Sequence, residues 1–250
     1  MKNHIIILAF LLLIGSVWSQ NNIHYISSAT RLKQKEKLNR TERYLRTLDP
    51  NIPIEGSMYL DDEFSPAVIV YDNGIIKDQL FFRYNAFYDE MEYIGPAGDT
   101  IVLEDLSGIK WIIIGPRKFI HDDVRKNHQT KKAFFEVISD GETRLLCRHT
   151  MIFERANPPY TALHHGYAYD RFRHQKLFYL QTADKPAQKI KLSRSGLIEA
   201  IPEKQEKIEK LWKTLRPNPS NISEIKTFFR VFQFFPAFLE WLLSIPSGRV

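Results

Sequence analysis

From residue 65 to about residue 192, the chain consists of short segments in which apolar and polar residues alternate, separated by turns too short to contain a helix. The first stretch, AVIVYDNGIIKDQLFFRYN, holds two such segments around Asn73 and Gly74, a pair that strongly favours a tight hairpin. Four further turns follow the same pattern. Parallel strands need crossover connections of about a dozen residues or more, so turns this short require antiparallel strands. The sequence therefore predicts an antiparallel sheet.

The predicted fold class is mainly β with flanking helices, of the α+β type. The β domain is expected to span residues 57–192 and to contain about ten antiparallel strands, largely as a meander. The spacing is compatible with a barrel, a half-barrel or a sandwich and does not choose between them. Helices that follow the β domain are expected to pack on it, because a sheet must bury one face.

Residues 193–250 change to a helical pattern, with apolar residues three and four positions apart. Ser193 and Ser223 are expected to cap two of the helices, and the last helix is expected to end before Pro236. This last segment is apolar nearly all round, which is typical of a helix that is buried, docked on a partner or laid on a membrane surface. The residues expected to make a partner or membrane contact are Phe228, Phe232, Phe235, Phe238 and Trp241.

The N-terminus indicates export. Lys2 precedes an apolar run over residues 5–14, and small residues then give a cleavage pattern that ends at Ser19. We predict a signal peptide over residues 1–19, followed by a basic N-terminal arm with one helix over residues 20–56. The apolar run is too short for a comfortable membrane span. The expected location is therefore the periplasm, or a position associated with the outer membrane.

Composition narrows the classes of fold and partner. The single cysteine, Cys147, cannot form an intrachain disulfide, so the fold must be stabilised by its core, and Cys147 itself is expected to be a buried structural thiol. The net charge is +6. In an exported protein this mild excess makes nucleic acid an improbable partner and favours an envelope protein or a polysaccharide. A peripheral membrane contact stays possible, and the oligomeric state is left open.

Polar residues gather on the hairpin FFRYNAFYDEMEYI, residues 81–94. Arg83 is expected to form a cross-strand ion pair with Glu90 or Glu92 on an open strand face, and Asn85 and Asp89 are expected to form the turn. The alternative is a ligand site, and two acids of this stretch could in principle cleave a glycosidic bond. The candidate binding residues are Arg83, Asn85, Asp89, Glu90 and Glu92.

Histidines offer a second set of candidates. His164 and His165 follow a Pro-Pro loop and are the strongest candidates in the sequence for acid–base chemistry or a metal. His121 with His128 could bind a metal, but their spacing matches no tetrahedral zinc pattern. The sequence has no nucleophile elbow, phosphate-binding glycine loop, H-E-x-x-H or Cys-x-x-Cys motif. We predict no cofactor, no metal site and no catalytic residue.

Two motifs carry a resemblance to a known group of proteins. Residues 56–64, GSMYLDDEF, match GSxYLxxEF, and residues 82–92, FRYNAFYDEME, are close to LRYNxxxDExE. Residues 191–197, KLSRSGL, are similar to a third motif, KxSKxxL. Together they resemble exported proteins of unknown function from Gram-negative bacteria. The resemblance covers roughly residues 55–235. It implies several hairpins followed by a C-terminal helical pair, and it brings no catalytic or cofactor residue with it.

The function expected from the sequence is that of an exported, non-catalytic binding or structural module of the bacterial cell envelope. One alternative is a hydrolase of an envelope polymer that uses the His164 and His165 loop or the acids of residues 89–92. Another is a peripheral membrane protein anchored by its aromatic C-terminal helix.

Overall fold

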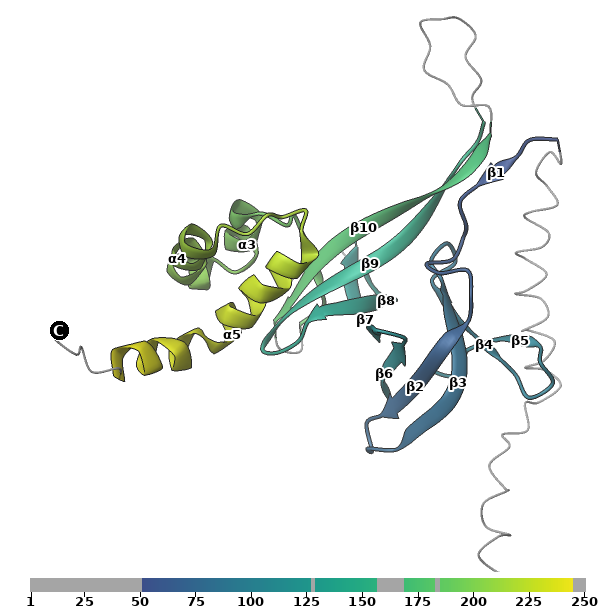
Figure 1. Ribbon diagram of the computed structural model, residues 1–250, viewed down its shortest axis with the longest axis horizontal. Helices are drawn as coiled ribbons and strands as arrows, with labels where there is room; N and C mark the ends of the chain where they lie inside the picture. Colours follow the sequence, from purple (N-terminus) through teal and green to yellow (C-terminus); the bar gives the residue numbers. More distant parts are fainter. Residues whose placement is uncertain (1–50, 127–128, 157–168, 183–184, 245–250) are drawn as a thin grey trace, which may run out of the picture. The chain divides into compact units, whose positions relative to one another are not determined.

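The computed structural model describes residues 51–126, 129–156, 169–182 and 185–244 of the chain, and its side chains up to residue 234 except residues 125, 126 and 129. These residues all belong to one compact unit, Asp49–Val250. They form an open sheet of eleven strands with three α-helices after it (Figure 1). The fold is therefore mainly β with flanking helices, as the sequence predicts. The predicted signal peptide and the N-terminal arm up to residue 50 lie outside the described residues.

The strands follow in the order β1-β10-β9-β8-β7-β6-β2-β3-β4-β5, with β11 beside β10. In the order of the chain, the first six strands are β1 (Ile54–Glu55), β2 (Ser65–Tyr71), β3 (Ile76–Asn85), β4 (Glu90–Ile94), β5 (Thr100–Val102) and β6 (Ile109–Ile114). The other five are β7 (Arg117–Lys126), β8 (Gln129–Ser139), β9 (Thr143–Glu154), β10 (Asp170–Thr182) and β11 (Gln188–Ile190).

The sheet departs from a simple antiparallel meander in two places. Strand β6 pairs with β2 and not with its predecessor β5, so two meanders join at the β2–β6 pair. Strand β1 pairs with β10 in parallel, which makes the sheet mixed. Both pairings join segments separated by long stretches of sequence, and an alternating pattern contains no information about which distant strand becomes the neighbour.

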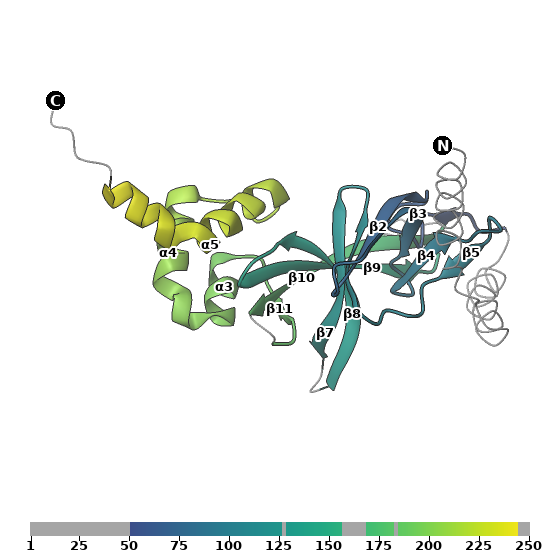
Figure 2. The same ribbon diagram turned by 90° about the horizontal axis from the view of Figure 1, so that it is seen from below.

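The sheet curls without closing. Tyr84 on β3 lies against Phe119 on β7 and Phe134 on β8, with ring centroids 5.5 and 5.9 Å apart, although β2 and β6 stand between these strands in the sheet. In Figure 2, strands β7 and β8 run steeply across the direction of β9 and β10. The apolar side chains enclosed by this curl come from six strands: Ala67, Ile69, Phe82, Tyr84, Met91, Ile112, Ile114, Phe119 and Phe134.

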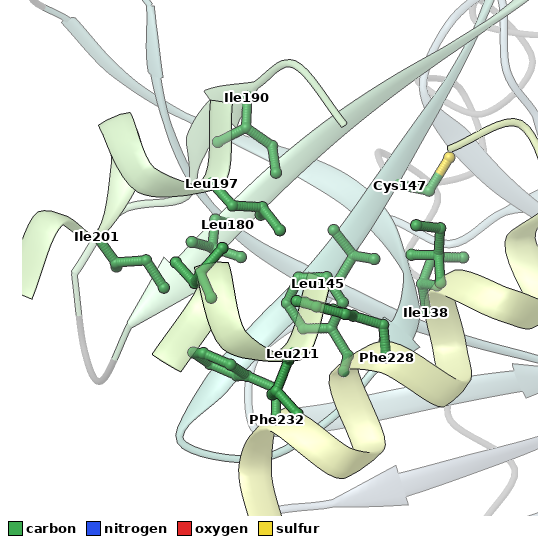
Figure 3. Packing of buried hydrophobic residues seen from close by; sticks show 13 residues of the cluster. Ile138, Leu145, Cys147, Leu180, Ile190, Leu197, Ile201, Leu211, Phe228 and Phe232 are labelled. Atoms are coloured by element: carbon green, nitrogen blue, oxygen red, sulfur yellow. The ribbon is translucent and has the colours of Figure 1, made fainter. Parts of the chain in front are cut away.

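The helices cover a second part of the sheet. They are α3 (Arg194–Ala200), α4 (Gln205–Leu215), preceded by a 3-10 turn over Pro202–Lys204, and α5 (Ile222–Ser244). Phe228 and Phe232 of α5 meet Leu145, Leu180 and other strand residues in one buried cluster (Figure 3). Cys147 is buried in the same cluster, as predicted, and burial is the main cause that raises the pKa of its thiol to about 12. No helix in the described part of the chain is long and apolar enough to cross a membrane.

Two details of the helix ends differ from the sequence prediction. Ser193 caps α3 as expected, because its side chain accepts a hydrogen bond from the Gly196 N–H. At the start of α5, however, the cap is Asn221, whose Oδ1 accepts from the Ser223 N–H at 3.1 Å. Helix α5 also continues past Pro236 to Ser244. A proline removes one helical hydrogen bond but does not oblige a helix to end.

The corrected cap gives a direct test. Asn221→Ala is expected to lower the free energy of unfolding by about 1 kcal/mol, because an N–H of the first turn loses its acceptor. Ser223→Ala, the matched control, is expected to change it by less than about 0.5 kcal/mol. Urea denaturation of both variants measures these values. Equal losses in the two variants would contradict the assignment of the cap to Asn221.

Candidate functional site

The polar hairpin picked out in the sequence forms a buried ion pair. Arg83 on β3 donates to Glu92 on β4 through Nε at 2.9 Å, and its Nη2 lies 2.8 Å from the same carboxylate oxygen. The second oxygen of Glu92 accepts from Asn85 Nδ2 at 3.3 Å. The predicted cross-strand pair is therefore present. Its predicted exposure is wrong, because Glu92 is only 2% exposed and Asn85 is completely buried.

The burial comes from the segment before β2. Tyr59 and Phe64 lie over the guanidinium of Arg83, with ring centroids 3.7 and 4.4 Å from its Cζ atom. Arg83 also donates to the Tyr59 hydroxyl at 2.9 Å. Burial, with the nearby charge of Glu92, raises the pKa of Tyr59 to about 12. The face that was expected to be open is thus covered by the GSMYLDDEF motif, and its charges are paired within the chain.

The turn between β3 and β4 lies where β8 and β9 separate. Strand β8 pairs with β9 only from Glu136 onward, although β9 stays paired with β10 along its length. The Asp89 carboxylate enters this opening, where it accepts from the Phe134 N–H at 3.3 Å and from Arg148 Nη2 at 2.8 Å. It also accepts from the Tyr84 hydroxyl at 2.5 Å.

These contacts give the hairpin residues internal partners. The Met151 N–H donates to the Ala86 carbonyl at 3.2 Å, so the backbone of the turn is bound to β9 as well. Glu90 pairs opposite Asn85 in the ladder and is half-buried. The structure therefore does not gather Arg83, Asn85, Asp89, Glu90 and Glu92 around an open cavity. Their contacts instead connect the β3–β4 hairpin with the segment before β2 and with strands β8 and β9.

The other sequence candidates have different outcomes. Phe228 and Phe232 are 1% and 2% exposed and pack against the sheet, so we leave them out of any partner or membrane surface. Phe235, Phe238 and Trp241 belong to the part of α5 whose side chains are not described. His128, His164 and His165 also lie outside the described residues. No group of three or more His, Cys, Asp or Glu side chains in the described residues could hold a metal ion.

A groove elsewhere on the sheet was not predicted from the sequence. Its volume is about 280 Å³, and strands β6 to β9 supply its walls. Trp111 is half-buried in it, and the ammonium groups of Lys110 and Lys118 lie 4.5 and 3.9 Å from its ring centroid. Asp122, Asp140 and Arg144 also line the groove. The groove thus combines an aromatic ring with basic side chains, which donate hydrogen bonds, and acidic side chains, which accept them.

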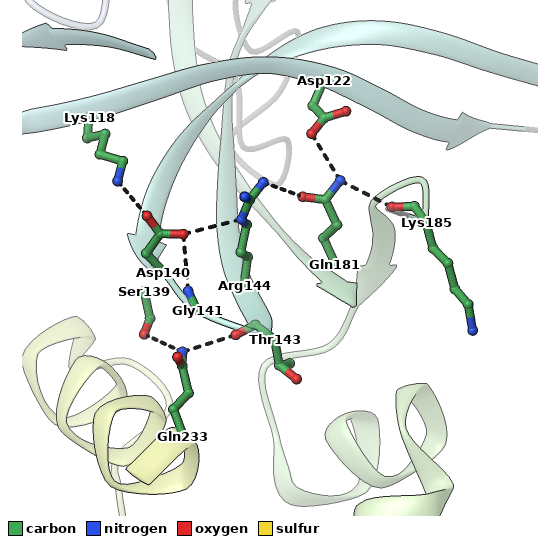
Figure 4. Close-up of polar contacts among 10 residues, drawn as sticks. All are labelled: Lys118, Asp122, Ser139, Asp140, Gly141, Thr143, Arg144, Gln181, Lys185 and Gln233. Carbon is green, nitrogen blue, oxygen red and sulfur yellow. Dashed lines mark hydrogen bonds and ion pairs between the residues drawn. The ribbon is translucent and has the colours of Figure 1, made fainter. Parts of the chain in front are cut away.

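A continuous series of polar contacts holds these groups in place (Figure 4). Asp140, at the β8–β9 turn, pairs with Lys118 at 2.5 Å and with Arg144 at 3.2 Å. Arg144 Nη1 donates to Gln181 Oε1 at 3.4 Å, and Gln181 Nε2 donates to Asp122 at 3.0 Å. Because Gln181 is only 4% exposed, its amide is a fixed link between β7, β9 and β10.

The charge state of the groove follows from these contacts. Burial alone would raise the pKa of Asp140. The hydrogen bond and charge of Lys118, the Gly141 N–H and the charge of Arg144 outweigh burial and lower the pKa below its usual value. Asp140 is therefore ionised at neutral pH and acts as a hydrogen-bond acceptor.

The chain matches no protein-family model, no curated protein and no solved structure.

Sequence reasoning missed the groove because it lies on no single motif. Trp111 and Lys118 are on the two strands of the Gly115-Pro116 hairpin, and Arg144 comes from the next hairpin but one. The register Ile113 opposite Lys118 places Trp111 diagonally from Lys118 on one face. An aromatic residue between basic ones in KWIIIGPRK was the one local signal.

Proposed function

We propose that this protein is an exported, non-catalytic binding module of the cell envelope, and that its groove holds a segment of an envelope polysaccharide. The observation that supports this most is the groove itself. Sugar hydroxyls both donate and accept, and the groove offers Asp122 and Asp140 as acceptors beside Lys118 and Arg144 as donors. Trp111 adds an amphipathic aromatic surface to its wall.

The state of Asp140 favours binding over hydrolysis. Glycoside cleavage needs one carboxylic acid that keeps its proton near neutral pH, usually because its pKa is raised. The pKa of Asp140 is shifted in the opposite direction. The acids first considered for this chemistry, Asp89 and Glu92, accept hydrogen bonds from Arg148 and Arg83. Carboxylates that are paired with basic side chains suit the recognition of a saccharide better than the transfer of a proton to it.

The test is isothermal titration calorimetry, in which the full chain is titrated with soluble fragments of envelope polysaccharide. The fragments are peptidoglycan glycan strands and the carbohydrate part of lipopolysaccharide. Arg144→Gln and Lys118→Gln are each expected to weaken binding at least about tenfold, because a charge-assisted hydrogen bond to the ligand contributes about 1.5–3 kcal/mol. Both side chains are about one-third exposed, so the fold should be retained.

Lys213→Gln on the exposed side of α4 is the matched control, since it removes the same charge far along the chain from the groove. It is expected to bind like the parent. Reducing ends are measured in the same samples. Release of new reducing ends would favour the hydrolase alternative, and failure to bind any of the fragments, or equal binding by all variants, would overturn the proposal.

A further inference from the structure

One edge of β10 has a gap in its strand pairing. Strand β9 occupies the other edge of β10 from Arg171 to Thr182. On the open edge, β1 pairs with Asp170 and Arg171, and β11 pairs with Phe178 to Leu180. Among the described residues, no strand pairs with this edge between those two points. Six residues, Phe172 to Leu177, separate the two pairings, and Gly56 lies against the first of them. The five residues from Arg173 to Leu177 therefore present an unpaired strand edge.

The two neighbouring strands leave β10 at defined points. Gly56 follows β1 with φ of +77°, and a Cβ placed on it would lie 2.6 Å from the Phe172 carbonyl oxygen. Only glycine lets the chain turn away this close to the β10 backbone. At the other end, Lys191 follows β11, and its carbonyl accepts from the Ser193 N–H at 2.8 Å as the chain enters α3. The gap is thus bounded by two turns.

The side chains along the gap are exposed and basic. Arg173, His174 and Lys176 are exposed, whereas the residues of β10 at both ends of the gap are largely buried. His174 and Lys176 share one face of the strand, because side chains alternate. Arg173 donates to Glu154 at 2.7 Å and faces the other side.

His174 is anchored to the interior. Its Nε2 lies 2.9 Å from Nδ1 of the buried His149, and Nε2 of His149 lies 2.7 Å from a Glu136 carboxylate oxygen. This row across β8, β9 and β10 fixes the ring of His174 next to β9, on the same face of β10 as Lys176.

We propose that the edge from Arg173 to Leu177 is a docking site for an extended acidic segment of a partner protein, which pairs with β10 as an added strand. Backbone hydrogen bonds supply the pairing, as in other strand additions. Acidic residues two positions apart on the added strand fall on the face of His174 and Lys176. This surface uses none of the groove residues, so it is independent of saccharide binding.

The chemistry of His174 predicts how such binding depends on pH. Burial, together with His149, Lys176 and Arg117, lowers the pKa of His174 in the free protein, against an opposing effect of Asp61. Carboxylates on the added strand would raise it again. Docking therefore takes up a proton and becomes tighter as the pH falls from 7.5 to 6, by at most about tenfold per pH unit for one proton.

The probe is a capped heptapeptide of alternating threonine and glutamate, labelled with fluorescein and titrated with the full chain by anisotropy. Lys176→Glu is expected to weaken binding at least about tenfold, because it places like charges opposite each other. Lys189→Glu on β11 is the matched control, with the same change of charge at an exposed site outside the gap. His174→Gln should bind with little dependence on pH.

A second peptide separates strand pairing from simple charge attraction. N-methylation of alternate residues keeps the charge and removes the backbone donors, so this peptide is expected not to bind. Equal binding of the methylated peptide, equal weakening by Lys189→Glu and Lys176→Glu, or no binding of the parent peptide would overturn the proposal. The last result would mean that the charges of this edge only protect it from association.

Discussion

Replacing Asp89 by alanine is expected to lower the free energy of unfolding by about 3–5 kcal/mol. Three donors lose this acceptor at once: the Phe134 N–H, the Arg148 guanidinium and the Tyr84 hydroxyl, which keeps only a long contact with the His149 carbonyl at 3.5 Å. Each buried donor left without a partner costs about 1–3 kcal/mol, and more if it is charged. For Arg148 this loss adds to an existing one, because its Nε is already buried without a hydrogen-bond partner among the described residues.

Urea denaturation of Asp89→Ala measures the loss, and Asp61→Ala is the matched control. Asp61 also pairs with an arginine, Arg117, but its side chain is 51% exposed, so the control is expected to lose less than about 1 kcal/mol. Hydrogen exchange adds a local reading, in which the Phe134 amide should exchange faster in Asp89→Ala. If Asp89→Ala lost no more than Asp61→Ala, the turn would not depend on its carboxylate.

The local parts of the fold could be read from the sequence. Asn73 and Gly74 form their hairpin, with Gly74 at φ of +81° and Asn73 Oδ1 accepting from the Ile75 N–H at 3.0 Å. Ser193 caps α3 as expected. These features succeed because a turn or a cap is decided by a few neighbouring residues whose backbone preferences are strong.

The non-local parts could not be read in the same way. Nothing in the two residues of β1 specifies a parallel neighbour on β10. The rings that cover Arg83, the partner of Glu92, are those of Tyr59 and Phe64, which come from a segment without a strand pattern. Alternation on β3 and β4 correctly places Arg83 and Glu92 on one face, but whether that face is wet is decided by what covers it.

The same limit explains the candidate site. The sequence drew attention to the hairpin of residues 81–94 because charges and aromatic residues are adjacent there in the chain. In the structure, the charged residues of this hairpin make contacts within the chain. The groove is formed by Trp111, Lys118 and Arg144, which come from three separate strands. Bringing together side chains that are distant in sequence requires the strand register, which the alternating pattern alone does not supply.

The second large effect is expected at Glu92. Glu92→Ala should lower the free energy of unfolding by about 3–5 kcal/mol, because removal of one partner leaves the other charge buried and unpaired. Arg83 lies under Tyr59 and Phe64 with a side chain only 19% exposed. Glu199→Ala on the exposed side of α3 is the matched control and is expected to change the value by less than about 0.5 kcal/mol.

A double-mutant cycle shows whether the loss belongs to the pair. Removing Arg83 as well, in Arg83→Met with Glu92→Ala, should restore part of the stability, because no unpaired charge is then left under the aromatic rings. Tyr59 reports on the same contact, since Glu92 helps to raise its pKa to about 12. In Glu92→Gln, which keeps the shape of the side chain, ultraviolet titration should show one tyrosine ionising at lower pH. Additive losses in the cycle, with an unchanged tyrosine titration, would mean that the ion pair does not hold residues 57–64 on the sheet.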